Sequence, residues 1–213
     1  MKQLSQYRSS VHFLIIGKPG TGKTYSLLTL PRPLLIIDAE GGLSTLLRSE
    51  ADISNIMYEN VTDFDELREL LRSIDYNKFK SIAIDTISGL QSFHTMKRYM
   101  SLNRENLPFS EWNYILVCLK NLFYEMKQHN IIFVVNVHER VDTNLLAPSL
   151  QGQSATEIFM YVDFAFRSVY LNGEYLWKIK GENEPLKFRG KAPKEEYVRQ
   201  NYTKLLEAMG IKL

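Results

Sequence analysis

Short apolar runs alternate with longer segments of mixed polarity over the first two thirds of the chain. The runs with strand character are residues 11–16, 34–38, 53–58, 81–85 and 131–137, of which 53–58 is the weakest. Between them, apolar residues recur at the spacing of helices over about 23–30, 63–74, 89–100 and 110–128. This alternation predicts an α/β fold, in which helices flank a mostly parallel central sheet.

The last third of the chain has a different pattern. Two apolar segments, 162–171 and 174–180, flank Asn172-Gly173, the strongest short signal for a hairpin. We therefore expect antiparallel strands at the C-terminal side of the sheet. Pro193 is placed to open a final helix over about 194–209. The apolar face of that helix would comprise Tyr197, Val198, Leu205, Leu206 and Met209.

Two segments are too polar for core elements and predict loops, at about 101–108 and 139–153. No linker, repeat or low-complexity tract interrupts the pattern. We expect one domain over residues 1–213, with its core at about 11–190. Of the 213 residues 45% are hydrophobic and 23% are charged, which is enough apolar surface for a full core.

Composition and the N-terminus predict a cytoplasmic protein. No N-terminal stretch has the apolar length of a signal peptide, and no segment is long enough to span a bilayer, so we expect no membrane partner. The single cysteine, Cys118, lies in an apolar run and excludes an internal disulfide framework. The net charge of +2 is too small to indicate nucleic-acid binding, so a DNA site would have to be local or built by assembly.

The first motif that indicates a chemical function lies in the turn after the first predicted strand. Residues 17–24 read Gly-Lys-Pro-Gly-Thr-Gly-Lys-Thr and match G-x-x-x-x-G-K-[ST] in full, between a strand and a helix. Glycines let backbone N–H groups turn towards phosphates, and the start of the helix adds further N–H groups. The alternative is a glycine-rich turn that binds nothing. The predicted nucleotide contacts are Gly17, Lys18, Pro19, Gly20, Thr21, Gly22, Lys23, Thr24 and Tyr25.

Three side chains, those of Lys23, Thr24 and Asp85, are expected to bind a triphosphate and Mg²⁺. Lys23 would contact the β- and γ-phosphates, and the Thr24 hydroxyl would bind Mg²⁺. Asp85 ends the strand 81–85 at the edge where open α/β sheets place ligands, and would complete the magnesium shell. Capping the next helix is the alternative role of Asp85. No Asn-Lys-x-Asp motif for guanine follows, which favours ATP over GTP.

Hydrolysis of ATP also requires a group that activates water. Many P-loop ATPases carry a glutamate directly after the strand-end aspartate, but Thr86 occupies that position here. Glu40 and His138 each follow an apolar strand and should emerge at the same sheet edge as the turn. Glu40 could orient the water, and His138 could report the γ-phosphate. Otherwise Glu40 is a charge before a Gly-Gly turn, and His138 is a loop histidine without a ligand.

These residues resemble motifs of the RecA family. Residues 37–40 (Ile-Asp-Ala-Glu) are similar to the segment that carries the catalytic glutamate of RecA. Residues 17–24 and 82–87 resemble the two nucleotide motifs of that family. RecA itself usually has glutamine at the γ-phosphate sensor, so His138 is a departure. The resemblance implies a RecA-like P-loop fold, ATP and Mg²⁺ as cofactors, and catalysis by Lys23, Glu40 and His138.

A closer resemblance is to short, phage-type RecA-like ATPases, nucleotide-binding proteins associated with single-strand annealing recombination. It rests on His138, residues 148–152 (Pro-Ser-Leu-Gln-Gly) and Asp163, in that order, and covers about 11–190. It implies a homo-oligomer, ring or filament, that assembles on single-stranded DNA. It also implies a single-strand-binding or annealing protein as a further partner, and the host cytoplasm as location if a phage encodes the chain.

The resemblance also implies two sets of further site residues. Basic residues of one subunit would reach the ATP of a neighbour, unless they form a solvated hairpin face. The loop 139–153 would contact DNA, weakly in each subunit, since it carries little charge. The candidates for the first role are Lys178, Lys180, Lys187 and Arg189. The candidates for the second are Arg140, Asn144, Gln151 and Gln153.

Two other functions stay open on the sequence. A nucleotide or small-molecule kinase would need an arginine-rich lid, for which the only hints are Lys97, Arg98 and Arg104, and it would leave Glu40 unexplained. A non-hydrolysing ATP switch that loads a partner protein, such as a helicase, would bind ATP without DNA-stimulated turnover.

Overall fold

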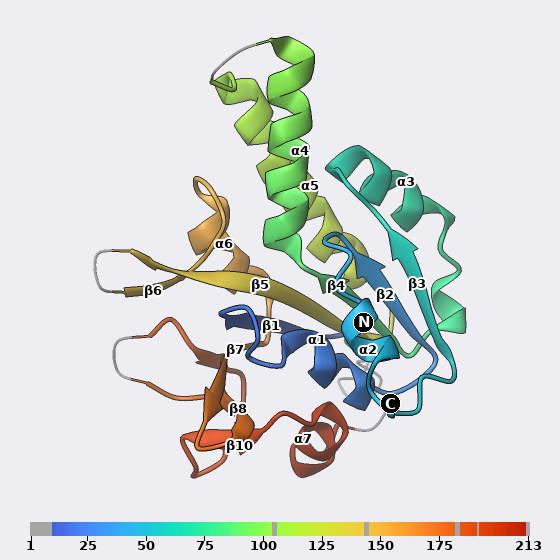
Figure 1. Cartoon of the computed structure of the whole chain (residues 1–213), viewed down its shortest axis with the longest axis vertical. Coiled ribbons are helices and arrows are strands. Elements are labelled where there is room, and N and C mark those ends of the chain that lie inside the picture. Colours follow the sequence, from blue (N-terminus) through green and yellow to red (C-terminus); the bar gives the residue numbers. More distant parts are fainter. Residues whose placement is uncertain (1–9, 104–105, 143–144, 182–183, 191, 212–213) are drawn as a thin grey trace, which may run out of the picture.

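A ten-stranded sheet forms the centre of the protein (Figure 1). The computed structural model describes residues 10–103, 106–142, 145–181, 184–190 and 192–211. Its strands are β1 (Val11–Gly17), β2 (Leu34–Asp38), β3 (Ile56–Asn60), β4 (Ser81–Asp85), β5 (Ile132–Asp142), β6 (Leu145–Pro148), β7 (Phe164–Leu171), β8 (Glu174–Lys178), β9 (Lys187–Phe188) and β10 (Tyr197–Arg199). Their order is β10-β8-β7-β1-β5-β4-β2-β3, with β6 paired to β5 and β9 paired to β7.

The six strands from β7 to β3 in this order are all parallel to their neighbours. At the other end, β8 pairs antiparallel with β7 across the Asn172-Gly173 turn, and β10 pairs antiparallel with β8. A mostly parallel sheet that antiparallel strands finish at the C-terminal side confirms the predicted fold class. Helical crossovers produce the parallel part, whereas the tight turn produces the antiparallel part.

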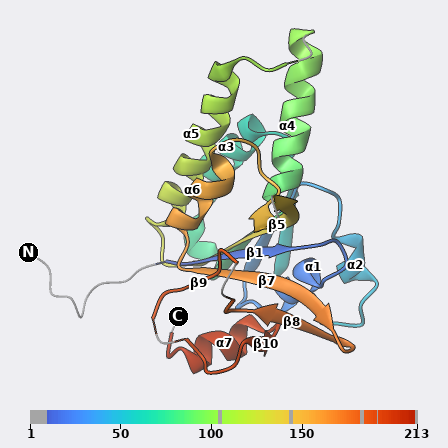
Figure 2. The same cartoon turned by 90° about the vertical axis from the view of Figure 1, so that its left-hand side faces the viewer.

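Helices cover both faces of the sheet (Figure 2). One face carries α3 (Phe64–Ser73), α4 (Ile87–Leu102), α5 (Phe109–Met126) and α6 (Ser154–Tyr161). The other carries α1 (Lys23–Ser26) with its 3₁₀ continuation η2 (Leu27–Thr29), α2 (Ser44–Leu47) and α7 (Tyr202–Ala208). A second 3₁₀ turn, η3, spans Tyr76–Lys78. No helix among the described residues has the length and apolar character needed to cross a membrane.

Alternation along β1 divides its side chains between two cores. Leu14 and Ile16 pack under α3 to α6, while Phe13 and Ile15 pack under α1 and α7, and all four are fully buried. Successive residues of a strand point to opposite faces, so a strand that is apolar throughout must be covered on both sides. The residue that follows such a strand therefore emerges at the edge of the sheet, where polar groups can gather.

The prediction of a final helix from about residue 194 is wrong at its start. Tyr197 and Val198 lie in β10, where Val198 pairs with Trp177 of β8. Helix α7 begins only at Tyr202, after Asn201, whose side chain accepts the Lys204 N–H at 2.9 Å. The two apolar residues assigned to the helix instead extend the sheet, because the edge of β8 offers them backbone partners.

The prediction of a loop over 139–153 is also wrong. Strand β5 continues to Asp142, and β6 returns antiparallel to it, with Arg140 opposite Ala147. Helix α6, which follows, has no counterpart among the predicted elements. Leu146 and Leu150 hold the described part of this segment against the protein, since both are buried in the core under α4 to α6. The other predicted helices and strands are present, but their ends differ from the prediction. The clearest case is β3, which was expected over 53–58 and runs from Ile56 to Asn60.

Candidate active site

The turn of residues 17–24 lies at the carboxyl edge of the sheet, between β1 and α1. Gly17 ends β1 and pairs with His138 of β5 on one side and Ser168 of β7 on the other. A Cβ at Gly17 would lie 2.8 Å from the Ser168 carbonyl oxygen, which is closer than real contacts allow. Gly22 has a φ of +92°, a left-handed conformation that favours glycine. Both positions therefore require glycine for this turn to form.

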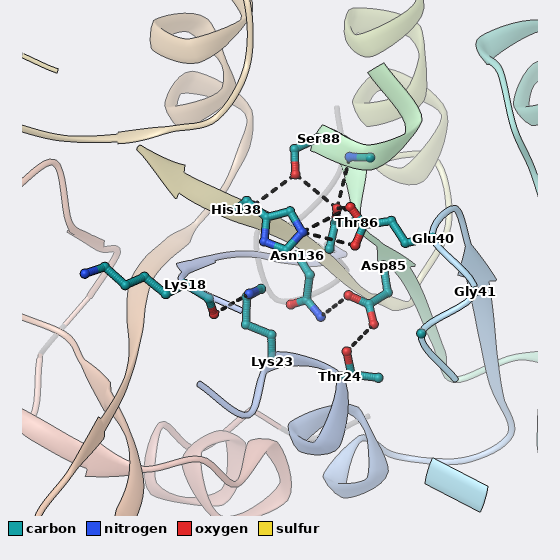
Figure 3. A network of polar contacts seen from close by, with 12 residues as sticks. Lys18, Lys23, Thr24, Glu40, Gly41, Asp85, Thr86, Ser88, Asn136 and His138 are labelled. Atoms are coloured by element: carbon teal, nitrogen blue, oxygen red, sulfur yellow. Dashed lines mark hydrogen bonds and ion pairs between the residues drawn. The ribbon is translucent and has the colours of Figure 1, made fainter. Parts of the chain in front are cut away.

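Lys23 lies inside this turn (Figure 3). The residue is buried, and its Nζ donates to the carbonyl oxygens of Gly17 and Lys18, both at 2.9 Å. Burial lowers the pKa of Lys23, and the nearby carboxylates of Asp85 and Glu40 oppose that shift. Three carboxylates, those of Asp85, Glu40 and Glu139, thus stabilise the charged ammonium group, and a phosphate would do the same.

Thr24, Asp85 and Asn136 form a second group of polar contacts. The Thr24 hydroxyl donates to Asp85 Oδ2 at 2.6 Å, and Asn136 Nδ2 donates to Asp85 Oδ1 at 3.1 Å (Figure 3). Burial raises the pKa of Asp85, while these two hydrogen bonds and Lys23 act in the opposite direction. Helix α4 is capped by Thr86, whose hydroxyl accepts the Gly89 N–H. Asp85 therefore does not cap that helix.

These residues fit a magnesium ion. A hydroxyl and a carboxylate are hard oxygen donors of the kind that Mg²⁺ prefers, and Thr24 and Asp85 already lie in contact. In addition, Asn136 Oδ1 is a buried acceptor without a hydrogen-bond partner in the described part of the chain. Buried acceptors are normally satisfied, so this oxygen is suited to a water of the ion's shell.

Glu40 lies at the centre of a third group, next to the second. Its Oε1 accepts the Thr86 hydroxyl at 2.9 Å, and His138 Nε2 lies 3.0 and 3.1 Å from its two oxygens (Figure 3). Ser88 Oγ accepts the backbone N–H of His138 at 3.0 Å. Burial alone would raise the pKa of Glu40, but the hydrogen bonds from His138 and Thr86 outweigh it and lower the pKa. Glu40 is therefore ionised at neutral pH.

One open cleft of about 590 Å³ connects the three groups. It brings together Lys23, Thr24, Glu40, Asp85 and His138, the residues that the sequence assigned to nucleotide, metal and water. Tyr25 also lines the cleft, as do Pro19, Gly20 and Gly22. The Lys18 side chain is different, because it is mostly exposed and extends away from the other side chains (Figure 3). Residues that the sequence did not assign and that also line the cleft are Gly42, Thr45, Arg48, Ser49, Thr86 and Tyr175.

Comparison with known proteins agrees with this geometry. A family model described as an AAA domain matches residues 9–184, which include the turn and all three groups of polar contacts. The chain belongs to this AAA domain family. Among curated proteins, none is significantly similar to the chain in sequence.

Solved structures show that this AAA domain has a RecA-like fold. The crystal structure of the RadB recombinase aligns with a TM-score of 0.53 at 17% identity, over 91% of this chain and 88% of that chain. The flagellar accessory protein FlaH from Methanocaldococcus jannaschii aligns with a TM-score of 0.52 at 14% identity, over 90% and 86% of the two chains. At such identities the likeness concerns the fold. Together with family membership it supports an ATP-binding ATPase.

The basic residues predicted to act on a neighbour's nucleotide all have partners within their own chain. Lys178 Nζ lies 3.3 Å from Glu184 and 3.4 Å from Glu196, and Arg189 lies 2.7 Å from Asp163. Lys187 Nζ donates to the Phe159 carbonyl, and Lys180 Nζ donates to the carbonyls of Pro193 and Lys194. These contacts add a structural role to each residue and leave the role in a neighbour as a prediction.

Arg189 and the turn of residues 17–24 contact strand β7 at different points along its length. The Arg189 N–H donates to the carbonyl of Asp163, directly before β7, whereas Gly17 pairs with Ser168 further along β7. Asp163 and Ser168 are five residues apart, which corresponds to about 17 Å along the strand. Arg189 therefore does not line the cleft of its own chain.

The residues predicted to contact DNA lie on the β5–β6 hairpin and the start of α6. Arg140 is in β5, and Gln151 and Gln153 are exposed residues before α6. The backbone N–H of Gln151 donates to Gln91 Oε1 of α4 at 2.7 Å, which ties this segment to the main body. Asn144 lies outside the described residues, as does Arg104 of the hypothetical kinase lid.

Three residues of the polar contact groups around Asp85 and Glu40 were not assigned by sequence reasoning. Asn136 interrupts the apolar strand β5, and a polar residue in a fully buried strand was the signal that could have identified it. At Thr86 the sequence shows only that the acid of many P-loop ATPases is missing, and it gives no signal at Ser88. Both are short hydroxyl side chains at the start of a helix, so their position is equally typical of capping.

Proposed function

We propose that this AAA domain is a magnesium-dependent ATPase that assembles on single-stranded DNA in recombination or annealing. The observation that supports hydrolysis most directly is that Lys23, the Thr24–Asp85 pair and Glu40 line one cleft. They supply a charge for the phosphates, ligands for a metal and a carboxylate for water, and those are the parts that phosphoryl transfer requires.

Nucleotide binding would use the turn and the residues beside it. Lys23 would exchange its two carbonyl acceptors for phosphate oxygens, which are stronger acceptors because they are charged. Thr24 and Asp85 would hold Mg²⁺, which neutralises charge on the β- and γ-phosphates when bound. The base would extend towards Tyr25 and Tyr175, two half-exposed rings on the wall of the cleft.

Glu40 would then orient the attacking water. In the structure its two oxygens are occupied by His138 and Thr86. A γ-phosphate within reach of His138 offers that ring a charged acceptor, so a Glu40 oxygen would become free to accept a hydrogen bond from water. His138 would thereby couple the arrival of the γ-phosphate to activation of the water.

The proposal of assembly on DNA has separate support. The motifs resemble those of RecA-like proteins that assemble on DNA, and one structural neighbour is named a recombinase. Arg189 is bonded to the chain at Asp163, about five strand residues from the turn, so a role at a nucleotide would have to be in a neighbour. The other similar solved structure is that of a flagellar accessory protein. The fold is therefore compatible with different partners, and the following experiment distinguishes between them.

We expect single-stranded DNA to increase ATP hydrolysis several-fold, and particles with a non-hydrolysable ATP analogue to be larger than a monomer. Assembly would bring the basic residues of one subunit to the nucleotide of the next. Phosphate release and light scattering, each with and without DNA, measure the two effects. ATP binding without DNA-stimulated turnover would instead indicate a switch that loads a partner such as a helicase. Phosphate transfer that requires an added acceptor would indicate a kinase.

Mixing inactive subunits tests whether Lys187 and Arg189 act in a neighbour. We expect the double variant Lys187→Ala, Arg189→Ala to lose DNA-stimulated turnover. Adding subunits with Glu40→Gln should restore part of it, because their intact basic residues would serve the intact sites of the double variant. Lys204→Ala, a change of an exposed lysine on α7, is the control. Parent-like turnover of the double variant alone would refute the role in a neighbour.

The kinase alternative gains no support from the described residues. Lys97 contacts Asp63 and Glu66, and Arg98 forms two hydrogen bonds with Glu111 at 2.6 and 2.8 Å. Both cations therefore connect helices of the core rather than line the cleft.

A further inference from the structure

A segment beyond the family match contacts the turn of residues 17–24. The match ends at residue 184, whereas Gln200 lies between β10 and α7. Gln200 Nε2 is 2.9 Å from the Thr21 carbonyl oxygen, 2.8 Å from Ser168 Oγ and 3.0 Å from the Leu176 carbonyl oxygen. Its Oε1 lies 2.7 Å from where a Cβ of Gly22 would be. The side chain is thus packed against the backbone of the turn.

The Thr21 carbonyl oxygen is the point at which the turn is held. Ser168 Oγ donates to it at 2.8 Å, in addition to Gln200 Nε2. Two side chains from separate elements, β7 and the segment after β10, therefore converge on one backbone oxygen. A carbonyl that accepts two hydrogen bonds has little freedom to rotate.

Because the Thr21 carbonyl oxygen is held in place, the N–H of the next residue, Gly22, is oriented as well. In a trans peptide the C=O and the following N–H point in opposite directions. Because the Thr21 carbonyl points towards Gln200 and Ser168, the N–H of Gly22 must point away from them. Gly22 lines the cleft, whereas Gln200 does not. The N–H of Gly22 is thus directed to the side on which a phosphate would bind.

We propose that Gln200 is a positioning residue for nucleotide binding, which holds the Thr21–Gly22 peptide so that its N–H faces a phosphate before the nucleotide arrives. The inference rests on the proposed ATP site and adds to it a contact from the C-terminal segment. A donor that is already oriented spares the binding step the cost of ordering it. Because Gln200 does not touch the cleft, its effect must pass through the turn.

Gln200→Met tests this with little change in shape, because methionine has a similar length but no N–H to donate. We expect the KM for ATP and the dissociation constant to rise about threefold to tenfold, the usual effect of losing one hydrogen bond. The kcat at saturating ATP should stay at the parent value, since bound phosphates would reorder the turn. Amide hydrogen exchange of Gly22 without nucleotide should accelerate. Gln128→Met, the same change at an exposed glutamine in the turn after α5, is the matched control.

The outcomes separate this inference from the proposed function. Parent-like affinity and parent-like Gly22 exchange in Gln200→Met would overturn the positioning role, while ATP binding by the parent would leave the ATPase proposal intact. A parent that binds no ATP would overturn both. A fall in kcat without a change in KM would also count against positioning. Ser168→Ala removes the other donor to the Thr21 oxygen and gives the same readouts if Gln200→Met does not fold.

Discussion

Lys23→Ala is expected to lower ATP affinity by about a hundredfold or more and to abolish measurable turnover. Each hydrogen bond from a charged donor contributes about 1.5–3 kcal/mol, and Lys23 has two carbonyl acceptors to exchange for two phosphate oxygens. Their joint loss of about 3 kcal/mol corresponds to about two orders of magnitude in affinity. Titration with a fluorescent ATP analogue measures the binding, and phosphate release measures the turnover.

Lys18→Ala is the matched control for this experiment. It removes a lysine from the same turn, but one whose side chain is mostly exposed and directed away from the cleft. We expect its affinity and turnover to equal those of the parent. If Lys23→Ala also retained the parent's affinity, the turn would not be the phosphate site, and the whole functional proposal would fail with it.

Glu40→Gln is expected to keep ATP binding and to reduce hydrolysis by at least about tenfold, which corresponds to about 1.4 kcal/mol of barrier. Glutamine retains an oxygen that can accept from Thr86 and His138, so the cleft should keep its shape. It lacks the negative charge that polarises a water molecule and helps to take its proton. Single-turnover hydrolysis at saturating ATP separates this effect from binding.

Glu59→Gln provides a comparison at an exposed position of the edge strand β3. It makes the same chemical change at a residue that does not line the cleft and should leave hydrolysis unaffected. If Glu40→Gln hydrolysed ATP as fast as the parent, Glu40 would not be the group that activates water. Another acid would then have to be sought, although the phosphate site itself would stand.

The main features of the fold and the site could be predicted from local patterns. Residues 17–24 form a contiguous motif, so their conformation depends mostly on their own glycines and on the flanking strand and helix. Asp85 and His138 could be placed together because parallel strands that are apolar throughout must end at one edge. The same argument placed Glu40 next to them, and in the structure it contacts His138 directly.

The errors arose where one element depends on the edge of another. Tyr197 and Val198 have a spacing that suits a helix, but they pair with β8, a partner that no local pattern shows. The polarity of the segment 139–153 predicts a loop, yet β5 extends far enough for β6 to pair with it. Strand pairing is a non-local interaction, and it overrides local propensity whenever a free edge is available.

The sequence by itself determined which residues are available for a nucleotide site, because the residue types suited to a triphosphate and magnesium lie in short motifs at strand ends. Only the tertiary structure decided how those motifs are supported. Asn136 contacts Asp85 from another strand, and Gln200 reaches Thr21 across 179 positions of the chain. The physical reason is that a hydrogen bond depends on distance in space, and polar atoms of residues so far apart in the chain come within bonding distance only when the sheet has assembled.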